Sequence, residues 1–430
     1  MENTVNRRTF IKTAAAASAA ATILKPGTVF GTAANSNIRL GIIGCGGRGT
    51  GVISSMVRNT DSRIVAIADI FEDQLMKGRE NLNKVNLEKG QPEIEQSHLF
   101  LGSKAYLRLL DQKDVDAVLV STPAFLHPEH MEAAVDAGKH VYCEKPVAVD
   151  AYGVERFRRA GKKAMGKVSL AVGFQIRHAT PYVEMVRRIQ EGAIGDIVTI
   201  QAYYYAGAIN ITWREDVPSA EARLRAWEWY RELSGDILVE QGIHVVDICN
   251  WALKSHPMRA VGSCGRKGRT DRGNVSSHYL VHFEYPGDVR VSFHSTQFDP
   301  GYGDVCERFF GTKGIAEAHY TGGVFIKGET PWDSGMVRGT QETISKEQWD
   351  IAAFKSALDD ADPNKQKAFI ESIKSGNFIN EANAGAESAL TAIMGRTAAY
   401  TGREVTWDQM IRSNERFDPK LDLTKFDKKG

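Results

Sequence analysis

The stretch that decides the fold is IRLGIIGCGGRG, residues 38–49. An apolar run, Ile38–Ile43, leads directly into the pattern G-x-G-x-x-G, and a helical stretch follows to about Arg58. In such a loop the first glycine permits the tight turn, the second lets the backbone approach a pyrophosphate, and the third lets helix and strand pack closely. The helix N-terminus would hold the anion. We therefore expect a dinucleotide-binding loop made of Gly44, Gly46, Gly47, Arg48 and Gly49.

A second apolar strand, Arg63–Ala68, ends in Asp69, twenty residues after Gly49. An acid at this distance is expected to meet the adenosine ribose hydroxyls. The alternative is an ordinary helix N-cap, which is common after a strand. The carboxylate would repel a 2′-phosphate, and the next two residues, Ile70 and Phe71, supply no arginine to receive one. The pattern therefore favours NAD over NADP.

Two further apolar strands end in polar residues. Val115–Val120 is followed by Ser121-Thr122-Pro123, and a short strand from His140 to Tyr142 leads into Glu144-Lys145-Pro146. Ligands of open α/β sheets bind at the carboxyl ends of the strands. Lys145 is therefore a candidate functional residue, and the alternative is a solvated loop lysine.

These motifs resemble a known family. Thr122-Pro123, His127, Ala133, the stretch AGKHV at 137–141 and Glu144-Lys145-Pro146 are similar to the dinucleotide domain of the Gfo/Idh/MocA oxidoreductases, which include glucose–fructose oxidoreductase and myo-inositol dehydrogenase. The resemblance covers most of residues 37–255. It implies that Ser121, Thr122, Pro123, His127 and Glu144 line the cofactor site and that Lys145 lies between nicotinamide and substrate. It also implies that the proline peptide of the 143–146 turn is often cis.

The second chemical motif is GDILVEQGIHVVD, residues 235–247, which predicts a helix continuing to about Leu253. Glu240 and His244 are four residues apart and would share a helix face. A carboxylate beside an imidazole suits a general base that takes a hydroxyl proton. The family has Asp-x-x-x-His here, so the longer Glu240 leaves open whether the acid partners His244 or contacts substrate. The alternatives are a structural helix pair, or a Glu–His metal pair, for which no third ligand is evident.

The substrate site is expected to include several further side chains. By resemblance, Gln175 and Arg177 follow the strand 168–173 and line the cleft, although each could instead make structural hydrogen bonds. The segment 210–233 is rich in tryptophan, and aromatic faces bind sugar C–H surfaces as readily as they pack. The candidate substrate-binding residues are thus Gln175, Arg177, Trp213, Trp227 and Asp247.

The C-terminal half predicts strands. Residues 258–325 alternate in polarity, with a hairpin turn at Tyr285-Pro286-Gly287-Asp288, and 364–375 and 381–401 are expected to be helices. The predicted fold is α/β, with a Rossmann domain at 37–165 and an α+β substrate-binding and oligomerisation domain at 166–430 that carries a large, mostly antiparallel sheet. The resemblance implies that the back of this sheet forms an oligomer interface, hence a homodimer or homotetramer.

Composition excludes several other classes of protein. The formal net charge of +1 gives no reason to expect nucleic acid as a partner. The five cysteines are scattered at 45, 143, 249, 264 and 306 and form no C-x-x-C pair, so neither a disulfide framework nor a structural zinc site is expected, and no metal is predicted.

Residues 1–35 form a separate segment. Arg7-Arg8 precedes a weakly apolar run, 13–24, and small residues follow at 31–34. The run is too short to span a bilayer, and the layout resembles a twin-arginine export signal. A disordered tail or an amphipathic helix is the alternative. We expect export to the periplasm with no membrane span in the mature protein, and NAD bound before export.

Together these features predict an NAD-dependent oxidoreductase that acts on a sugar, glycoside or cyclitol, with tightly bound NAD. Lys145, His244 and Glu240 are the predicted catalytic residues. Two alternatives remain: a redox-type glycoside hydrolase like the family 109 enzymes, and a non-catalytic sugar- or nucleotide-binding module.

Overall fold

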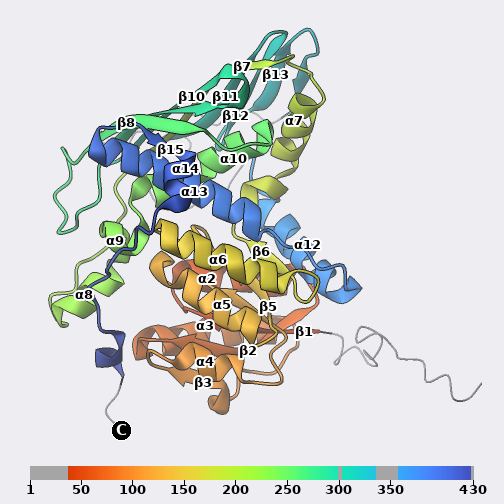
Figure 1. Ribbon diagram of the computed structural model, residues 1–430. Helices are drawn as coiled ribbons and strands as arrows, with labels where there is room; N and C mark the ends of the chain where they lie inside the picture. The colour runs from red at the N-terminus through yellow and green to blue at the C-terminus, as the bar shows by residue number, and fades with distance from the viewer. Residues whose placement is uncertain (1–36, 299–302, 336–356, 428–430) are drawn as a thin grey trace, which may run out of the picture.

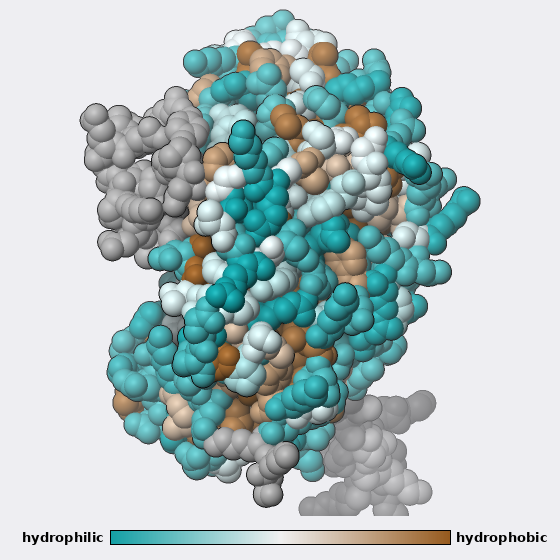
Figure 2. Space-filling model, turned by 90° about the vertical axis from the view of Figure 1, so that its left-hand side faces the viewer, coloured by the Kyte–Doolittle hydropathy of each residue, from teal (hydrophilic) through white to brown (hydrophobic). Residues whose placement is uncertain are grey.

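The computed structural model describes residues 37–298, 303–335 and 357–427. The predicted export signal at 1–35 lies outside these residues. The described chain forms two sheet layers stacked one above the other, with helices on and between them (Figure 1). The surface that faces the viewer in Figure 2 is mainly hydrophilic, with apolar residues in scattered groups.

The first sheet has six parallel strands in the order β3-β2-β1-β4-β5-β6. This is the doubly wound order, whose ligand crevice opens where the order reverses between β1 and β4. The predicted Rossmann fold is confirmed. The strands are β1 (Ile38–Ile43), β2 (Ser62–Asp69), β3 (Leu99–Leu101), β4 (Ala117–Val120), β5 (His140–Cys143) and β6 (Leu170–Val172), and the helices are α2 (Gly47–Asn59), α3 (Glu72–Glu88), α4 (Ala105–Leu110), α5 (His127–Asp136) and α6 (Ala151–Ala164).

The strands of this sheet are continuous apolar runs because helices cover both faces. All four residues of β4 and all three of β6 are buried. Since β6 pairs with β5, the sheet extends beyond residue 165 to residue 172.

The second sheet has nine strands in the order β14-β13-β12-β11-β7-β10-β9-β8-β15. β7 and β10 run parallel, and the other paired neighbours run antiparallel. The expected large, mostly antiparallel sheet is confirmed. Its strands are β7 (Ile197–Ala206), β8 (Arg259–Gly265), β9 (His278–Tyr285), β10 (Val289–Gln297), β11 (Asp304–Gly311), β12 (Gly314–His319), β13 (Val324–Gly328), β14 (Trp332–Asp333) and β15 (Val405–Thr406).

One face of this sheet belongs to the hydrophobic core. Phe283, Phe293 and Phe309 are fully buried, whereas Leu280 on the other face is exposed. This alternation is that of strands with one covered face. The helices of this part are α7 (Thr180–Gln190), α8 (Ser219–Arg225), α9 (Arg231–Ser234), α10 (Ile243–Leu253), α12 (Ala361–Ser375), α13 (Ala382–Thr401) and α14 (Trp407–Arg412).

Helix α13 joins the two layers. It packs against β8 of the second sheet and against α6 of the first (Figure 1), and its side chains are buried on almost all sides. Helix α12 returns to the first layer and packs on α2. Neither these nor the other helices of the described ranges combine the length and apolar character needed to cross a membrane.

Candidate active site

Of the four glycines in the loop, two have no room for a Cβ atom and two have open space around that position. Gly44 has a φ of +97°, and a Cβ there would lie 2.5 Å from the Ser121 carbonyl oxygen. A Cβ on Gly49 would lie 2.6 Å from the Gly44 carbonyl oxygen. A Cβ on Gly46 or Gly47 would meet no atom of the described residues within 4 Å. The first and third glycines of the motif are therefore required by packing, whereas Gly46 and Gly47 face open space.

Helix α2 begins at this loop. Its N-cap is Gly46, which has an extended backbone and, in the described chain, no side-chain cap, and its first turn carries no acid. The first N–H groups of a helix lack intrahelical partners and favour an anion. The loop and helix thus fit the pyrophosphate of a dinucleotide.

Asp69 closes the other side of the loop. Its Oδ2 accepts a 2.7 Å hydrogen bond from the Cys45 amide, and its Oδ1 accepts one of 2.8 Å from the Phe71 amide. Burial raises the pKa of this carboxyl, and the amide donors oppose that rise. Asp69 therefore lies at the loop, where a ribose would pass.

The structure adds Arg225 to this region. Its guanidinium lies 3.9 Å from the centre of the Phe71 ring and forms ion pairs with Asp73 at 2.7 Å and Glu221 at 2.8 Å. Both acids compensate its charge. The sequence neighbours of Asp69 gave no sign of this arginine, because it comes from α8.

Arg48 and Glu144, both predicted to bind cofactor, bind each other. Arg48 Nε donates to Glu144 Oε1 at 3.1 Å, and its NH1 reaches Asp362 at 3.3 Å. Burial raises the pKa of Glu144, and Arg48 lowers it. A Cβ on Gly173 would come within 2.4 Å of Glu144 Oε2, so this glycine makes room for the buried acid.

His127 braces two loops at the edge of the sheet. Its Nδ1 lies 2.7 Å from the Pro146 carbonyl oxygen and its Nε2 lies 2.7 Å from that of Thr122. Burial lowers its pKa to about 4. The Lys145–Pro146 peptide is cis, as the resemblance implied. His127 therefore ties the Ser121-Thr122-Pro123 loop after β4 to the turn that carries Lys145.

Lys145 reaches across to the second domain. Its Nζ donates to the Glu240 carbonyl oxygen at 2.6 Å and to Glu240 Oε1 at 2.8 Å. Each side chain is 14% exposed. An ammonium has three N–H donors, of which these contacts use two.

Glu240 lies in a π turn, Leu238–Gly242, that directly precedes α10. The sequence predicted one regular helix in which Glu240 and His244 share a face. The wider turn, with i→i+5 hydrogen bonds, changes that spacing, and in the structure Glu240 and His244 form no hydrogen bond with each other. Glu240 binds Lys145 instead, through both its backbone and its side chain.

His244 is a buried, neutral imidazole. It is 7% exposed, and its Nδ1 has no hydrogen-bond partner among the described residues. Phe174 packs edge-on against the ring at 6.3 Å. Burial first, and then the nearby charges of Lys145 and Arg48, hold its pKa well below the ordinary value of 6.5. A neutral imidazole can accept a proton.

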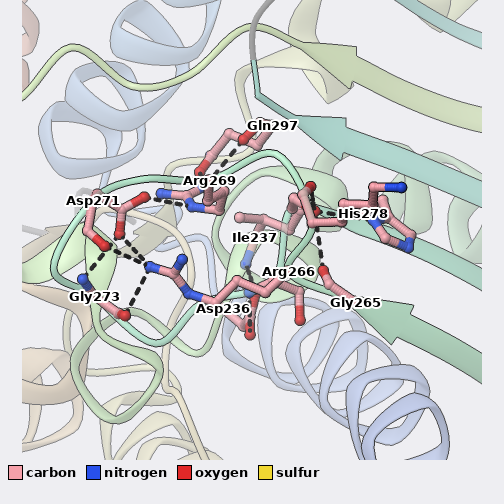
Figure 3. A network of polar contacts seen from close by, with 12 residues as sticks. Asp236, Ile237, Gly265, Arg266, Arg269, Asp271, Gly273, His278 and Gln297 are labelled. Carbon is pink, nitrogen blue, oxygen red and sulfur yellow. Dashed lines mark hydrogen bonds and ion pairs between the residues drawn. The ribbon is translucent and has the colours of Figure 1, made fainter.

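A polar network fixes the start of the π turn. Asp236 has a φ of 77°, and its carboxylate accepts hydrogen bonds from the amides of Ile237 at 2.6 Å and Ser276 at 3.1 Å and from the Tyr400 hydroxyl at 2.5 Å. Figure 3 shows Asp236 beside the loop 266–273, in which Asp271 pairs with Arg266 at 2.6 Å and with Arg269 at 2.7 Å. The β8–β9 loop and α13 thus support the segment that carries Glu240.

The predicted substrate residues differ in their surroundings. The Gln175 side chain is 3% exposed, and its Oε1 is buried without a partner among the described residues. Arg177 and Asp247 form a two-pronged ion pair at 2.7 and 2.9 Å, and Ser388 donates to the same carboxylate at 2.7 Å. Gln175 thus retains unused hydrogen-bonding capacity, whereas Arg177 and Asp247 satisfy each other.

The two tryptophans also differ. Trp213 stacks on Trp229 with ring centres 6.5 Å apart, and Arg272 lies 5.2 Å from its ring centre. Trp227 is half-buried in a short 3-10 turn, Trp227–Trp229. The substrate roles of these residues stay predictions.

Sequence reasoning missed Glu228. Burial, with Glu240 next in size, raises its pKa to about 8, whereas Lys145 lowers it. The site therefore holds a second acid that is largely protonated at neutral pH. Glu228 lies between Trp227 and Trp229, in the tryptophan-rich segment that the sequence already singled out. Its distance along the chain from Lys145 did not indicate that the two residues would be close in space.

The fold and the site define a dinucleotide-binding oxidoreductase. Two models of one family match consecutive parts of the chain: "Oxidoreductase family, NAD-binding Rossmann fold" at residues 38–174 and "GFO/IDH/MocA C-terminal domain" at residues 182–317. Together they cover more than half of the chain, which belongs to the Gfo/Idh/MocA oxidoreductase family. The NAD-binding Rossmann domain is thereby confirmed.

Curated relatives and solved structures agree with this assignment. The chain is 26% identical to a myo-inositol 2-dehydrogenase of Thermotoga maritima over 84% of this chain and 95% of the relative. It is 24% identical to an inositol 2-dehydrogenase of Azotobacter vinelandii over 74% of this chain and 82% of the relative. An aldose-aldose oxidoreductase of Caulobacter crescentus has a similar fold, with a TM-score of 0.66 and 20% identity over 86% of this chain and 99% of that chain.

Proposed function

We propose that this protein oxidises a hydroxyl group, or reduces the corresponding keto group, of a sugar, glycoside or cyclitol with NAD. The observation that carries the proposal is the contact of Lys145 with Glu240 beside the neutral His244, at the carboxyl end of β5. The names of the relatives, which act on inositol and aldoses, support the substrate class.

Each residue of the site has a different role in the proposed reaction. NAD, when bound, supplies the hydride acceptor. His244 takes the hydroxyl proton, because its depressed pKa keeps the imidazole unprotonated and therefore able to accept one. Lys145 keeps one N–H donor for the reacting oxygen while Glu240 fixes its position.

A panel of sugars and cyclitols assayed by NADH formation tests this proposal. We expect His244→Ala and Lys145→Ala each to lower turnover at least about a hundredfold, the usual size of a general acid–base contribution. The controls are Lys162→Ala, near the end of α6, and His256→Ala, whose ring stacks on Trp407. A loss below about tenfold in both site variants would overturn the assignment.

Glu228 favours a second candidate function, a redox-type glycoside hydrolase. Such an enzyme must protonate a leaving group, and an acid with its pKa raised to about 8 can do so at neutral pH. Release of the aglycone from aryl glycosides, without net NADH formation, would support this function. Net accumulation of NADH and keto-sugar from the same glycosides, with no cleavage, would exclude it.

The preference for NAD over NADP is also a proposal. It rests on the Asp69 carboxylate at the glycine loop and on Arg225, whose charge is compensated by Asp73 and Glu221. We expect Asp69→Ala to reduce the ratio of kcat/KM for NAD over NADP at least about tenfold, and Asp136→Ala, at the end of α5, to leave it unchanged. An unaltered ratio in Asp69→Ala would contradict the role of this acid.

We further propose that the chain is exported by the twin-arginine route with NAD aboard and assembles as a homodimer or homotetramer. An exported enzyme cannot rely on exchange of free NAD, which supports a captive cofactor. The test is to purify the protein without nucleotide, denature it and quantify released NAD(H). Near-stoichiometric NAD supports capture, whereas an empty protein argues against it. Replacement of Arg7-Arg8 by Lys-Lys tests the export route, because it should abolish export if the twin-arginine pair is required. Light scattering measures the molar mass of the particle and thus the number of subunits.

A further inference from the structure

The second sheet carries a group of metal-binding side chains on the face opposite its core. Cys306 on β11 lies directly across from His319 on β12, and Glu317 is two residues before His319 on the same face. One ligand atom of each residue, namely the cysteine sulfur, a ring nitrogen and a carboxylate oxygen, lies within 4.8 Å of the other two. The cysteine spacing in the sequence gave no sign of this group, because strand pairing brings the residues together.

The surroundings of His319 match those of a metal ligand. Its Nδ1 lies 2.9 Å from Asp304 Oδ1, and the Tyr203 hydroxyl donates to Asp304 Oδ2 at 3.0 Å. A metal-bound histidine almost always donates its other ring N–H to a carboxylate or carbonyl, which fixes the tautomer. Asp304 therefore holds the proton on Nδ1 and leaves Nε2 as the ligand atom.

Nε2 and Glu317 already lie close enough to share a cation. Glu317 Oε1 is 2.7 Å from His319 Nε2, and Arg308 contacts the other carboxylate oxygen. With ligand bonds of about 2.0–2.3 Å, a tetrahedral zinc ion holds its ligand atoms about 3.3–3.6 Å apart. Adjustments of roughly 1 Å in these side chains would therefore admit the ion in place of the shared proton.

The group also has access and space. A cavity of about 510 Å³ adjoins it, lined by Arg308, Glu317, His319, Gly323, Phe325 and Lys327 among others. Cys306 and His319 are almost fully buried, and His319 and Glu317 line the cavity. The cavity leaves room for a water molecule as a fourth ligand.

We propose that Cys306 Sγ, His319 Nε2 and Glu317 Oε1 bind one zinc-class divalent ion that links β11 to β12. Sulfur, imidazole and carboxylate together suit zinc or its tetrahedral substitutes, whereas magnesium and calcium require oxygen ligands. The ion binds with loss of the thiol proton and of the proton that His319 Nε2 shares with Glu317 Oε1. This site is independent of the oxidoreductase function, because its residues take no part in the dinucleotide site.

The test uses full-length protein, stripped with a chelator and titrated with Zn²⁺ in a calorimeter. We expect one equivalent per chain, with affinity lowered at least about a hundredfold in Cys306→Ser and His319→Gln. Asp304→Asn, which removes only the orienting carboxylate, should cost about 10–100-fold. Cys264→Ser, on β8 of the same sheet, and His98→Gln, in the first layer, are the matched controls and should bind normally.

A second measurement with cobalt needs only the wild-type protein, so it remains informative if a variant misfolds. Stripped wild-type protein titrated with Co²⁺ should show the visible bands of a tetrahedral site and a thiolate charge-transfer band. Binding that stays below a fifth of an equivalent, a cobalt spectrum without the thiolate band, or equal affinity in folded Cys306→Ser and wild type would each overturn the proposal.

Discussion

Alanine substitutions at Gly44 and Gly46 of the glycine loop, with Gly51 of helix α2 as a control, separate cofactor binding from folding. Gly46 has a φ of −68° and a ψ of 178°, which alanine adopts without strain, and a Cβ there meets no described protein atom within 4 Å. Gly46→Ala should therefore cost only about 0.5 kcal/mol of stability, the difference between glycine and alanine at an N-cap. Its methyl group enters the space assigned to the pyrophosphate, so we expect the Kd for NAD to rise at least about tenfold, or about 1.4 kcal/mol.

Gly44→Ala should behave differently. Its φ of +97° costs a non-glycine residue about 1–2 kcal/mol, and its Cβ would lie only 2.5 Å from the Ser121 carbonyl oxygen. We expect a loss of more than about 2 kcal/mol in the free energy of unfolding. Gly51→Ala is the control, because it is exposed within α2 with open space around its Cβ. It should stabilise the helix by about 0.5–1 kcal/mol and leave the affinity for NAD unchanged.

Urea unfolding and NADH-fluorescence titration of the three variants measure both quantities. If Gly46→Ala binds NAD as tightly as wild type, the loop does not approach the pyrophosphate. If Gly46→Ala is destabilised as much as Gly44→Ala, the space at Gly46 is not open.

Three further predictions concern ionisable groups. In Lys145→Met the pKa of His244 should rise, because a cation that depresses it is lost. The acid limb of the pH profile of kcat/KM should therefore move to higher pH. An unmoved limb would mean that the charge of Lys145 does not affect the titration of His244. In Glu228→Gln the pH dependence of activity near pH 8 should disappear, because the acid with a pKa of about 8 is replaced by a neutral analogue; its persistence would assign that limb to another group. Burial alone would raise the pKa of Glu381, but Lys365 and His178 lower it to about 2. The ionised carboxylate therefore stabilises the fold above the unfolded-state pKa, and this stabilisation is lost as the pH falls toward 2. Glu381→Gln should therefore be less stable than wild type by about 3 kcal/mol at pH 7, and the difference should shrink between about pH 5 and pH 2 in acid-unfolding curves; a constant difference would mean that the effect is not electrostatic.

The first layer could be predicted from the sequence because its signals are local. The signals lie within a few tens of residues of one another: the glycine loop, the apolar runs and Asp69. The apolar runs are informative because a parallel sheet buried on both faces requires them. The pairing of β7 with β10 could not be predicted in the same way. Period-2 alternation identifies strands but does not specify which strand lies beside which.

The site itself was only partly visible. Lys145 follows a strand, so the sheet positions it, but its contact with Glu240 depends on the π turn at Leu238–Gly242. Those five residues are compatible with an ordinary helix in sequence, and the surrounding network at Asp236 determines the wider turn. Glu228 and Arg225 reach the site through tertiary packing alone, which no spacing along the chain encodes.

The return of helix α12 to the first layer has a consequence for synthesis of the chain. Phe369 and Ile370 complete the core beneath the nucleotide-binding loop, and Asp362 pairs with Arg48, 314 residues earlier. Contacts between such distant positions must wait until the later segment has left the ribosome. The N-terminal layer therefore emerges with part of its apolar surface uncovered, and the nucleotide cradle reaches its final form only after translation has passed residue 370. A fragment that ends at residue 174 would contain the whole glycine loop and yet lack this cover.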